Sequence, residues 1–150
     1  MESITPILEF KKTCVSYTKQ TMAVKYVSAA IERNTITAIM GPSGCGKSTL
    51  LRAVNLMHNL YPNIRVDGEI LLNGANILSM EPIEVRRKIG MVFQSFQLFD
   101  NLTVIENIVL SPILNKLMSK EEAYKQAKEY LKQIHLEDKE KTYPKNLSGG

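Results

Sequence analysis

Residues 35–49 read TITAIMGPSGCGKST. The first six, 35–40, are β-branched or apolar and carry no charge, which is typical of a strand buried on both faces of a parallel sheet. Glycines 41, 44 and 46 follow, and from Lys47 to Leu60 the apolar residues recur at helical spacing. The stretch therefore predicts a strand, a tight loop and a helix in succession.

The loop has the form Gly-x-x-x-x-Gly-Lys-Ser, which suits a chain of phosphates. Its glycines let successive backbone N–H groups point inward as an anion nest, and the positive end of the following helix adds to the attraction. In this motif Lys47 reaches the β- and γ-phosphates, and the Ser48 hydroxyl ligates Mg²⁺. Cys45 is interpreted as a small tolerated side chain in preference to a redox switch. The residues predicted to contact the nucleotide are Gly41, Pro42, Ser43, Gly44, Cys45, Gly46, Lys47, Ser48 and Thr49.

Composition indicates an ordinary globular protein. The 150 residues are 44% apolar and 23% charged with a net charge of +4, which excludes disordered, collagen-like and disulfide-scaffold classes. Cys14 and Cys45 make no disulfide framework, and the N-terminus lacks a signal-peptide pattern, so we expect a soluble, cytoplasmic protein. His58 and His135 have no partner at metal-ligand spacing and are expected to be structural or exposed.

The remaining pattern separates an α/β part from a helical part. Up to Gln94 strands and helices alternate, and beyond it only helical patterns occur. We expect a single partial domain, with an α/β core at about 1–94 and a helical subdomain at about 95–150. Ser119 and Glu122 form a capping box for the last helix. The other predicted strands are 7–17, 22–32, 67–73 and 89–93, and the other helices are 82–88, 103–110 and 120–134.

Three further segments carry a resemblance. Residues 91–94 read MVFQ, residues 98–108 read LFDNLTVIENI, and residues 147–150 read LSGG. Together with GPSGCGKST, they resemble the ATP-binding subunits of ABC transporters over essentially all 150 residues. The resemblance implies an α/β fold, in which a P-loop NTPase (RecA-like) core carries an N-terminal antiparallel β subdomain and a helical subdomain, with the C-terminal part missing.

The resemblance also implies roles for individual residues. Tyr17 stands where the family stacks an aromatic ring on adenine, although a strand tyrosine packed on its neighbour is the alternative. Gln94 resembles the residue that touches Mg²⁺ or the attacking water, and it acts in catalysis with Lys47. The signature residues Ser148, Gly149 and Gly150 are implied to bind the γ-phosphate of ATP held by a second subunit in a head-to-tail dimer.

Partners follow from the same resemblance. Phe96, Leu98, Phe99 and the residues to Leu110 are implied to dock a helix of a transmembrane permease, or else to form the core of the helical subdomain. A solute-binding protein is an indirect partner, and the subunit would lie on the inner face of the membrane. The mixed charges of residues 120–141 indicate a solvated surface, so no nucleic acid is expected.

The sequence departs from the family after LSGG. Family members continue into an apolar strand ending in Asp-Glu, a D-loop and a switch histidine, and none of these occurs by residue 150. We therefore expect a truncated subunit whose missing strands would flank residues 35–40. Alone, it would bind ATP poorly, would not hydrolyse it, and would expose an apolar strand edge.

Several functions remain open. The long stretch 56–68, LMHNLYPNIRVDG, resembles phosphate importers, whereas residues 93–113, FQSFQLFDNLTVIENIVLSPI, are similar to polar amino-acid importers. Phosphate is favoured as the solute. The further alternatives are a non-transport ABC ATPase in DNA repair or translation, a small P-loop kinase, and a nucleotide-binding module without catalysis.

Overall fold

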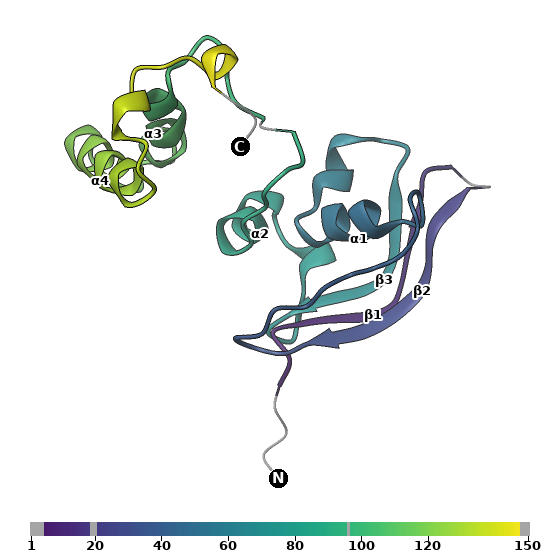
Figure 1. The fold of residues 1–150 in the computed structure, drawn as a ribbon. Helices are drawn as coiled ribbons and strands as arrows, with labels where there is room; N and C mark the ends of the chain where they lie inside the picture. Colours follow the sequence, from purple (N-terminus) through teal and green to yellow (C-terminus); the bar gives the residue numbers. More distant parts are fainter. Residues whose placement is uncertain (1–4, 19–20, 96, 148–150) are drawn as a thin grey trace. The chain divides into compact units, whose positions relative to one another are not determined.

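The computed structural model describes residues 5–18, 21–95 and 97–147, which form two compact units, Met1–Val92 and Phe93–Gly150. The first unit is built on a four-stranded antiparallel sheet in the order β2-β1-β3-β4. Its strands are β1 (Leu8–Ser16), β2 (Met22–Ile31), β3 (Arg65–Leu72) and β4 (Ala75–Asn76). The mixed α/β class and the antiparallel N-terminal sheet are thus confirmed (Figure 1).

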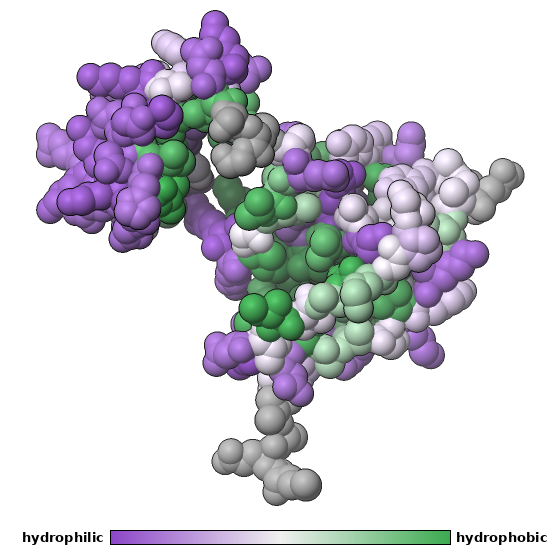
Figure 2. Space-filling model, in the orientation of Figure 1, coloured by the Kyte–Doolittle hydropathy of each residue, from purple (hydrophilic) through white to green (hydrophobic). Residues whose placement is uncertain are grey.

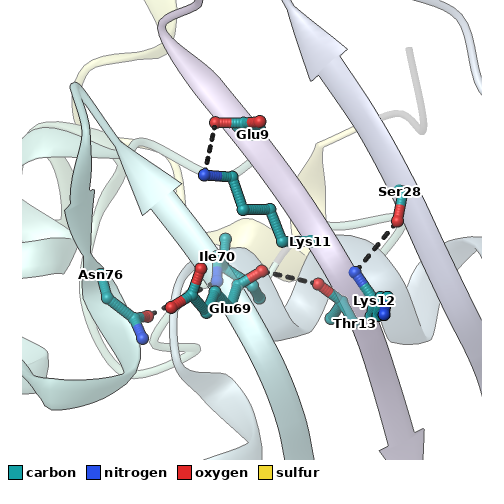
Figure 3. Close-up of polar contacts among 8 residues, drawn as sticks. All are labelled: Glu9, Lys11, Lys12, Thr13, Ser28, Glu69, Ile70 and Asn76. Atoms are coloured by element: carbon teal, nitrogen blue, oxygen red, sulfur yellow. Dashed lines mark hydrogen bonds and ion pairs between the residues drawn. The ribbon is translucent and has the colours of Figure 1, made fainter.

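The central strand β1 pairs with β2 on one side and β3 on the other, and it is irregular near its middle. Its register with β2 shifts between Phe10 and Thr13, where Lys12 has a φ of 48°. At this bulge the Lys12 N–H donates to Ser28 Oγ at 3.0 Å, and Thr13 Oγ1 donates to the Glu69 carbonyl at 2.8 Å (Figure 3). The fully buried Thr13 is therefore satisfied across the sheet.

The first unit's helices lie on one side of the sheet. They are α1 (Lys47–Val54) and α2 (Pro82–Lys88), with short 3₁₀ turns at Met57–Leu60 and Ile77–Ser79. Figure 1 shows α1 over the strands and α2 beside it. Apolar side chains buried between these helices and the sheet drive the packing, because each buried aliphatic side chain contributes about 1.5–3 kcal/mol to stability. The buried cluster comprises Phe10, Val15, Val24, Leu50, Ala53, Val54, Leu56, Ile70, Ile77 and Val85.

The first helix ends earlier than predicted. The sequence predicts one helix over 47–60, but α1 stops at Val54 and a separate 3₁₀ turn begins at Met57. Leu56 has a φ of 56°, a left-handed conformation that no helix continues through. Its side chain is almost completely buried, so core packing holds the backbone in this conformation.

The strands predicted at 35–40 and 89–93 are wrong. Both segments lack ladder partners among the described residues, and Ile36, Met40 and Val92 are 102%, 88% and 98% exposed. A buried parallel strand needs a neighbour on each side, and the described part of the chain supplies only antiparallel strands. Residues 35–40 therefore do not form the strand edge that was expected, although Ile36 and Met40 are exposed as single apolar side chains. Figure 2 shows hydrophobic surface gathered on this unit.

The second unit is a helical pair. It contains α3 (Val104–Leu114) and α4 (Lys120–Gln133), with 3₁₀ turns at Glu137–Lys139 and Pro144–Asn146. The predicted capping box is confirmed, since Ser119 Oγ accepts from the Glu122 N–H and the Glu122 carboxylate accepts from the Ser119 N–H. A second capping box, of Thr103 and Glu106, starts α3. In the part of the chain that is described, no helix has the length and apolarity that crossing a bilayer requires.

Candidate functional site

The loop before α1 has the backbone of a phosphate cradle. Gly44 and Gly46 have φ values of 78° and 98°, left-handed conformations that L-residues rarely adopt. A Cβ built on Gly46 would lie 2.6 Å from the Ala23 carbonyl oxygen of β2. Glycine is therefore required at 46 both for the turn and for the close approach of β2.

Lys47 turns back over the loop that precedes it. Its Nζ donates to the carbonyls of Gly41 and Pro42, each at 2.8 Å, and lies 3.7 Å from Cys45 Sγ. These contacts hold an ammonium group within the loop at the N-terminal end of α1. Because the helix dipole favours an anion at the same place, two sources of positive potential coincide there.

The two hydroxyl residues after Lys47 have different surroundings. Ser48 is exposed in the first turn of α1, so its oxygen is open to a ligand. An exposed hydroxyl is the type of hard oxygen donor that Mg²⁺ accepts beside phosphates, so the residue fits the ion. Thr49 is half-buried, and its Oγ1 lies 2.9 Å from the Tyr17 hydroxyl, with which it shares a hydrogen bond.

Tyr17 is thus brought next to the phosphate loop, as an adenine-stacking residue would have to be. It follows β1, and 37% of its surface is exposed. Its hydroxyl is anchored on α1 while ring surface remains accessible. A flat aromatic face near a phosphate site is suited to stacking a base.

The other predicted site residues belong to the second unit or lie outside the described residues. Gln94 is exposed in a bend of the second unit. Leu98 and Phe99 are exposed, at 40% and 56%, and lie in the same unit. Phe96, Ser148, Gly149 and Gly150 lie outside the described residues.

The sequence did not predict a set of contacts at the C-terminal end of α1, the end away from the loop. Arg86 of α2 donates to the carbonyls of Asn55 and Leu56, at 3.1 and 2.9 Å, and so caps the C-terminal end of α1. Asn55 Nδ2 reaches Met91 Sδ at 2.9 Å. Since these partners are 30 to 36 residues apart, no local pattern could have indicated them.

His58 was also missed as a lining residue. It is half-buried beside a cavity that Tyr17 and Thr49 also line. Burial, and then the positive charge of Arg86, lower the pKa of His58 below its ordinary value. The imidazole is therefore neutral at pH 7. In the described ranges, no group of three or more metal-ligating side chains gathers, so His58 belongs to no metal cluster.

The chain is similar in sequence to several proteins that share one description. Phosphate import ATP-binding proteins PstB of Pyrococcus furiosus and Thermococcus kodakarensis are 46% and 44% identical to the chain, over 83% and 89% of its length. A PstB 1 protein of a Synechococcus species is 41% identical over 99% of the chain. These alignments cover 52%, 56% and 54% of the relatives, so the chain spans about half their length.

A solved structure agrees with these relatives. It is cbiO1 from Clostridium perfringens, described as part of the ABC transporter complex cbiONQ. It superposes with a TM-score of 0.74 at 30% identity, over 96% of this chain and 56% of that one. The family described as ABC transporter matches residues 24–150, from β2 to the end of the sequence. With its phosphate loop and antiparallel sheet, the chain belongs to the ABC transporter family.

Proposed function

We propose that the chain is the nucleotide-binding part of an ATPase subunit that drives an ABC importer. The observation that carries this proposal is the phosphate loop, where Lys47 holds an ammonium group beside left-handed glycines at the start of α1. Such a loop neutralises the charge of a nucleoside triphosphate with main-chain N–H groups and one fixed cation. Hydrolysis of the bound ATP would power the import.

Roles for the surrounding residues belong to the same proposal. Tyr17 stacks on the adenine, and Ser48 supplies the hydroxyl ligand of Mg²⁺. Gln94 acts at the γ-phosphate and the metal ion, and Lys47 stabilises the charge that develops there. Ser148, Gly149 and Gly150 bind the γ-phosphate of ATP held by a second, head-to-tail subunit. Each site is then completed in trans.

Inorganic phosphate is the solute that we favour. The stretch 56–68 already favours phosphate importers, and the Pyrococcus, Thermococcus and Synechococcus relatives are named for phosphate import. The partners would be a permease embedded in the membrane and, indirectly, a phosphate-binding protein. The subunit would work at the cytoplasmic face of the membrane and bind no nucleic acid.

Residues 1–150 alone are proposed to bind ATP weakly and not to hydrolyse it. No apolar strand in this sequence ends in the paired acids that would hold Mg²⁺ and polarise the attacking water. Steady-state ATP hydrolysis by the purified 150-residue chain, measured as phosphate release, would contradict this point.

The test of the whole proposal is Lys47→Ala in the protein as its gene encodes it. Loss of a charged hydrogen-bond donor should weaken ATP binding about 10- to 100-fold, measured by calorimetry. Uptake of radiolabelled phosphate by cells carrying the variant should be lost as well.

Lys25→Ala is the matched control, because Lys25 is an exposed lysine of β2 outside the loop. It should leave both measurements unchanged. Full ATP affinity and full uptake in the Lys47 variant would overturn the proposed function.

A further inference from the structure

An asparagine of α3 holds the loop that precedes this helix. The Asn107 amide pairs with both main-chain polar groups of Phe99: its Oδ1 accepts from the Phe99 N–H at 2.8 Å, and its Nδ2 donates to the Phe99 carbonyl at 3.1 Å. The two N–H groups of Nδ2 are shared with the carbonyls of Leu102 and Thr103, at 3.1 and 3.0 Å. One side chain therefore fixes the main chain of residues 99–103.

The loop is held by its own backbone as well. The Leu102 N–H donates to the Phe99 carbonyl at 3.0 Å, which closes a turn over residues 99–102. Gln97, two residues before Phe99, has a φ of 50°, a left-handed conformation that is uncommon for a residue with a long side chain. Such strain persists only where the surrounding contacts fix the backbone. The loop thus has one defined conformation.

The fixed loop presents apolar side chains to solvent. Phe99 is 56% exposed and Leu98 is 40% exposed. Neither belongs to the buried cluster of the second unit, which consists of Ile105, Val109, Ala123 and Ala127. A rigidly held, exposed aromatic ring is typical of the few residues that dominate a protein–protein interface.

We propose that Asn107 is a positioning residue that holds the Phe99 ring ready for contact with the permease. The inference rests on the proposed function, which has the permease as a partner, and it goes beyond that function by naming a residue that acts through the loop. A ring that is fixed before contact loses less conformational entropy on binding than a ring on a mobile loop. The phosphate loop belongs to the other unit, so ATP affinity should not depend on Asn107.

The experiment uses the protein as its gene encodes it and membranes of the cells that carry the gene. Asn107→Ala should lower the membrane-bound fraction, measured by sedimentation, about fivefold or more, and leave the ATP affinity measured by calorimetry as it was. Hydrogen exchange should become faster at residues 97–103 and stay unchanged in α4, which shows that the unit is folded. Asn107→Asp, which keeps the acceptor for the Phe99 N–H and loses the donors, takes its place if the alanine variant does not fold.

Phe99→Ala removes the ring itself from an exposed position. It should cause the same loss of membrane binding. If Asn107 acts through Phe99, the double variant loses no more than Phe99→Ala alone, whereas two independent roles would give losses that multiply. Two controls on the same helix should change none of these measurements: Asn115→Ala, where the side chain donates to Ser111, and Leu114→Ala, at a leucine that is 71% exposed.

The outcomes separate this inference from the proposed function. Full membrane binding by the folded Asn107 variant or by Phe99→Ala would overturn the inference and leave the phosphate loop standing. Multiplying losses in the double variant would overturn it too, because Asn107 would then act independently of the ring. If the unsubstituted protein binds ATP but no membrane, the permease contact and the inference both fail. If it binds no ATP, the proposed function fails.

Discussion

Gly46 is the position of the phosphate loop with the least space around it. Its φ is 98°, and an added Cβ would meet the Ala23 carbonyl at 2.6 Å and Val24 Cγ2 at 3.1 Å. We expect Gly46→Ala to lower the free energy of unfolding of the first unit by about 1–3 kcal/mol or more, because backbone strain and a clash with main chain combine. Urea denaturation followed by circular dichroism measures the change.

Gly44→Ala is the matched control for that change. Gly44 also has a left-handed φ, 78°, but nothing lies within 4 Å of an added Cβ. The control should cost only the backbone strain, about 1 kcal/mol. Equal losses at the two glycines would show that the contact with β2 does not matter.

His58 gives the first unit a dependence on pH. Because burial and the charge of Arg86 lower its pKa, the unfolded chain takes up a proton more readily than the folded one. Stability should therefore fall as the pH decreases through the ordinary histidine value of about 6.5 toward the lower folded value. Thermal unfolding at pH 7.5 and 5.5 measures this loss.

His58→Phe should reduce that pH dependence, since the side chain that takes up the proton is gone. His135→Phe, at an exposed position in the second unit, should leave the dependence as it was. An identical loss of stability in the unsubstituted protein and the His58 variant would contradict the assignment.

Helix α1 is held at both ends by other parts of the first unit. The loop and β2 constrain its start, and Arg86 of α2 satisfies two carbonyls after its end. We expect Arg86→Gln to cost about 1.5–3 kcal/mol of unfolding free energy, because buried carbonyls lose a charged donor. Chemical denaturation monitored by circular dichroism would show the loss.

Arg87→Gln is the matched control on the same helix. Arg87 is exposed, and removal of its charge should stay within about 0.5 kcal/mol. If both substitutions cost the same, the two hydrogen bonds of Arg86 contribute little to the stability of α1.

The sequence predicted well those helices whose ends are marked by nearby residues, such as a capping residue or a proline. Helix α2 has the predicted bounds, α4 differs by one residue, and the capping box of Ser119 and Glu122 is formed. Segments 35–40 and 89–93 were wrong because an apolar run indicates burial without supplying a neighbouring strand. The end of α1 at Val54 depends on packing around Leu56, which helical spacing cannot reveal.

The candidate site likewise has one part that the sequence predicts and one part that only the folded structure shows. The phosphate loop is contiguous in sequence and was predicted with its residues, although their roles stay predictions. The cavity beside it brings Tyr17 together with Arg52 and Asn63, more than 30 residues further along the chain, so only folding shows it.

The chain consists of two units with separate buried clusters. Ile70 is fully buried in the first cluster, and Ile105 is 7% exposed in the second. We expect Ile70→Ala to cost the first unit about 2–5 kcal/mol and to leave the second unit's stability unchanged. Hydrogen exchange read by mass spectrometry resolves the two units separately.

Ile105→Ala is the reciprocal variant. It should increase exchange in α3 and α4, with no increase in β1, β2 and β3. Faster exchange in both units from either substitution would mean that the clusters unfold as one.

The exposed segment 35–40, which has no ladder partner among the described residues, has a consequence for self-association. Its short β-branched, uncharged run combines the properties from which cross-β fibrils grow. Glu32 and Arg33 precede it and Pro42 follows it, so charge on one side and a missing amide hydrogen on the other act as gatekeepers. These flanking residues oppose stacking of newly made chains while the segment is unpaired.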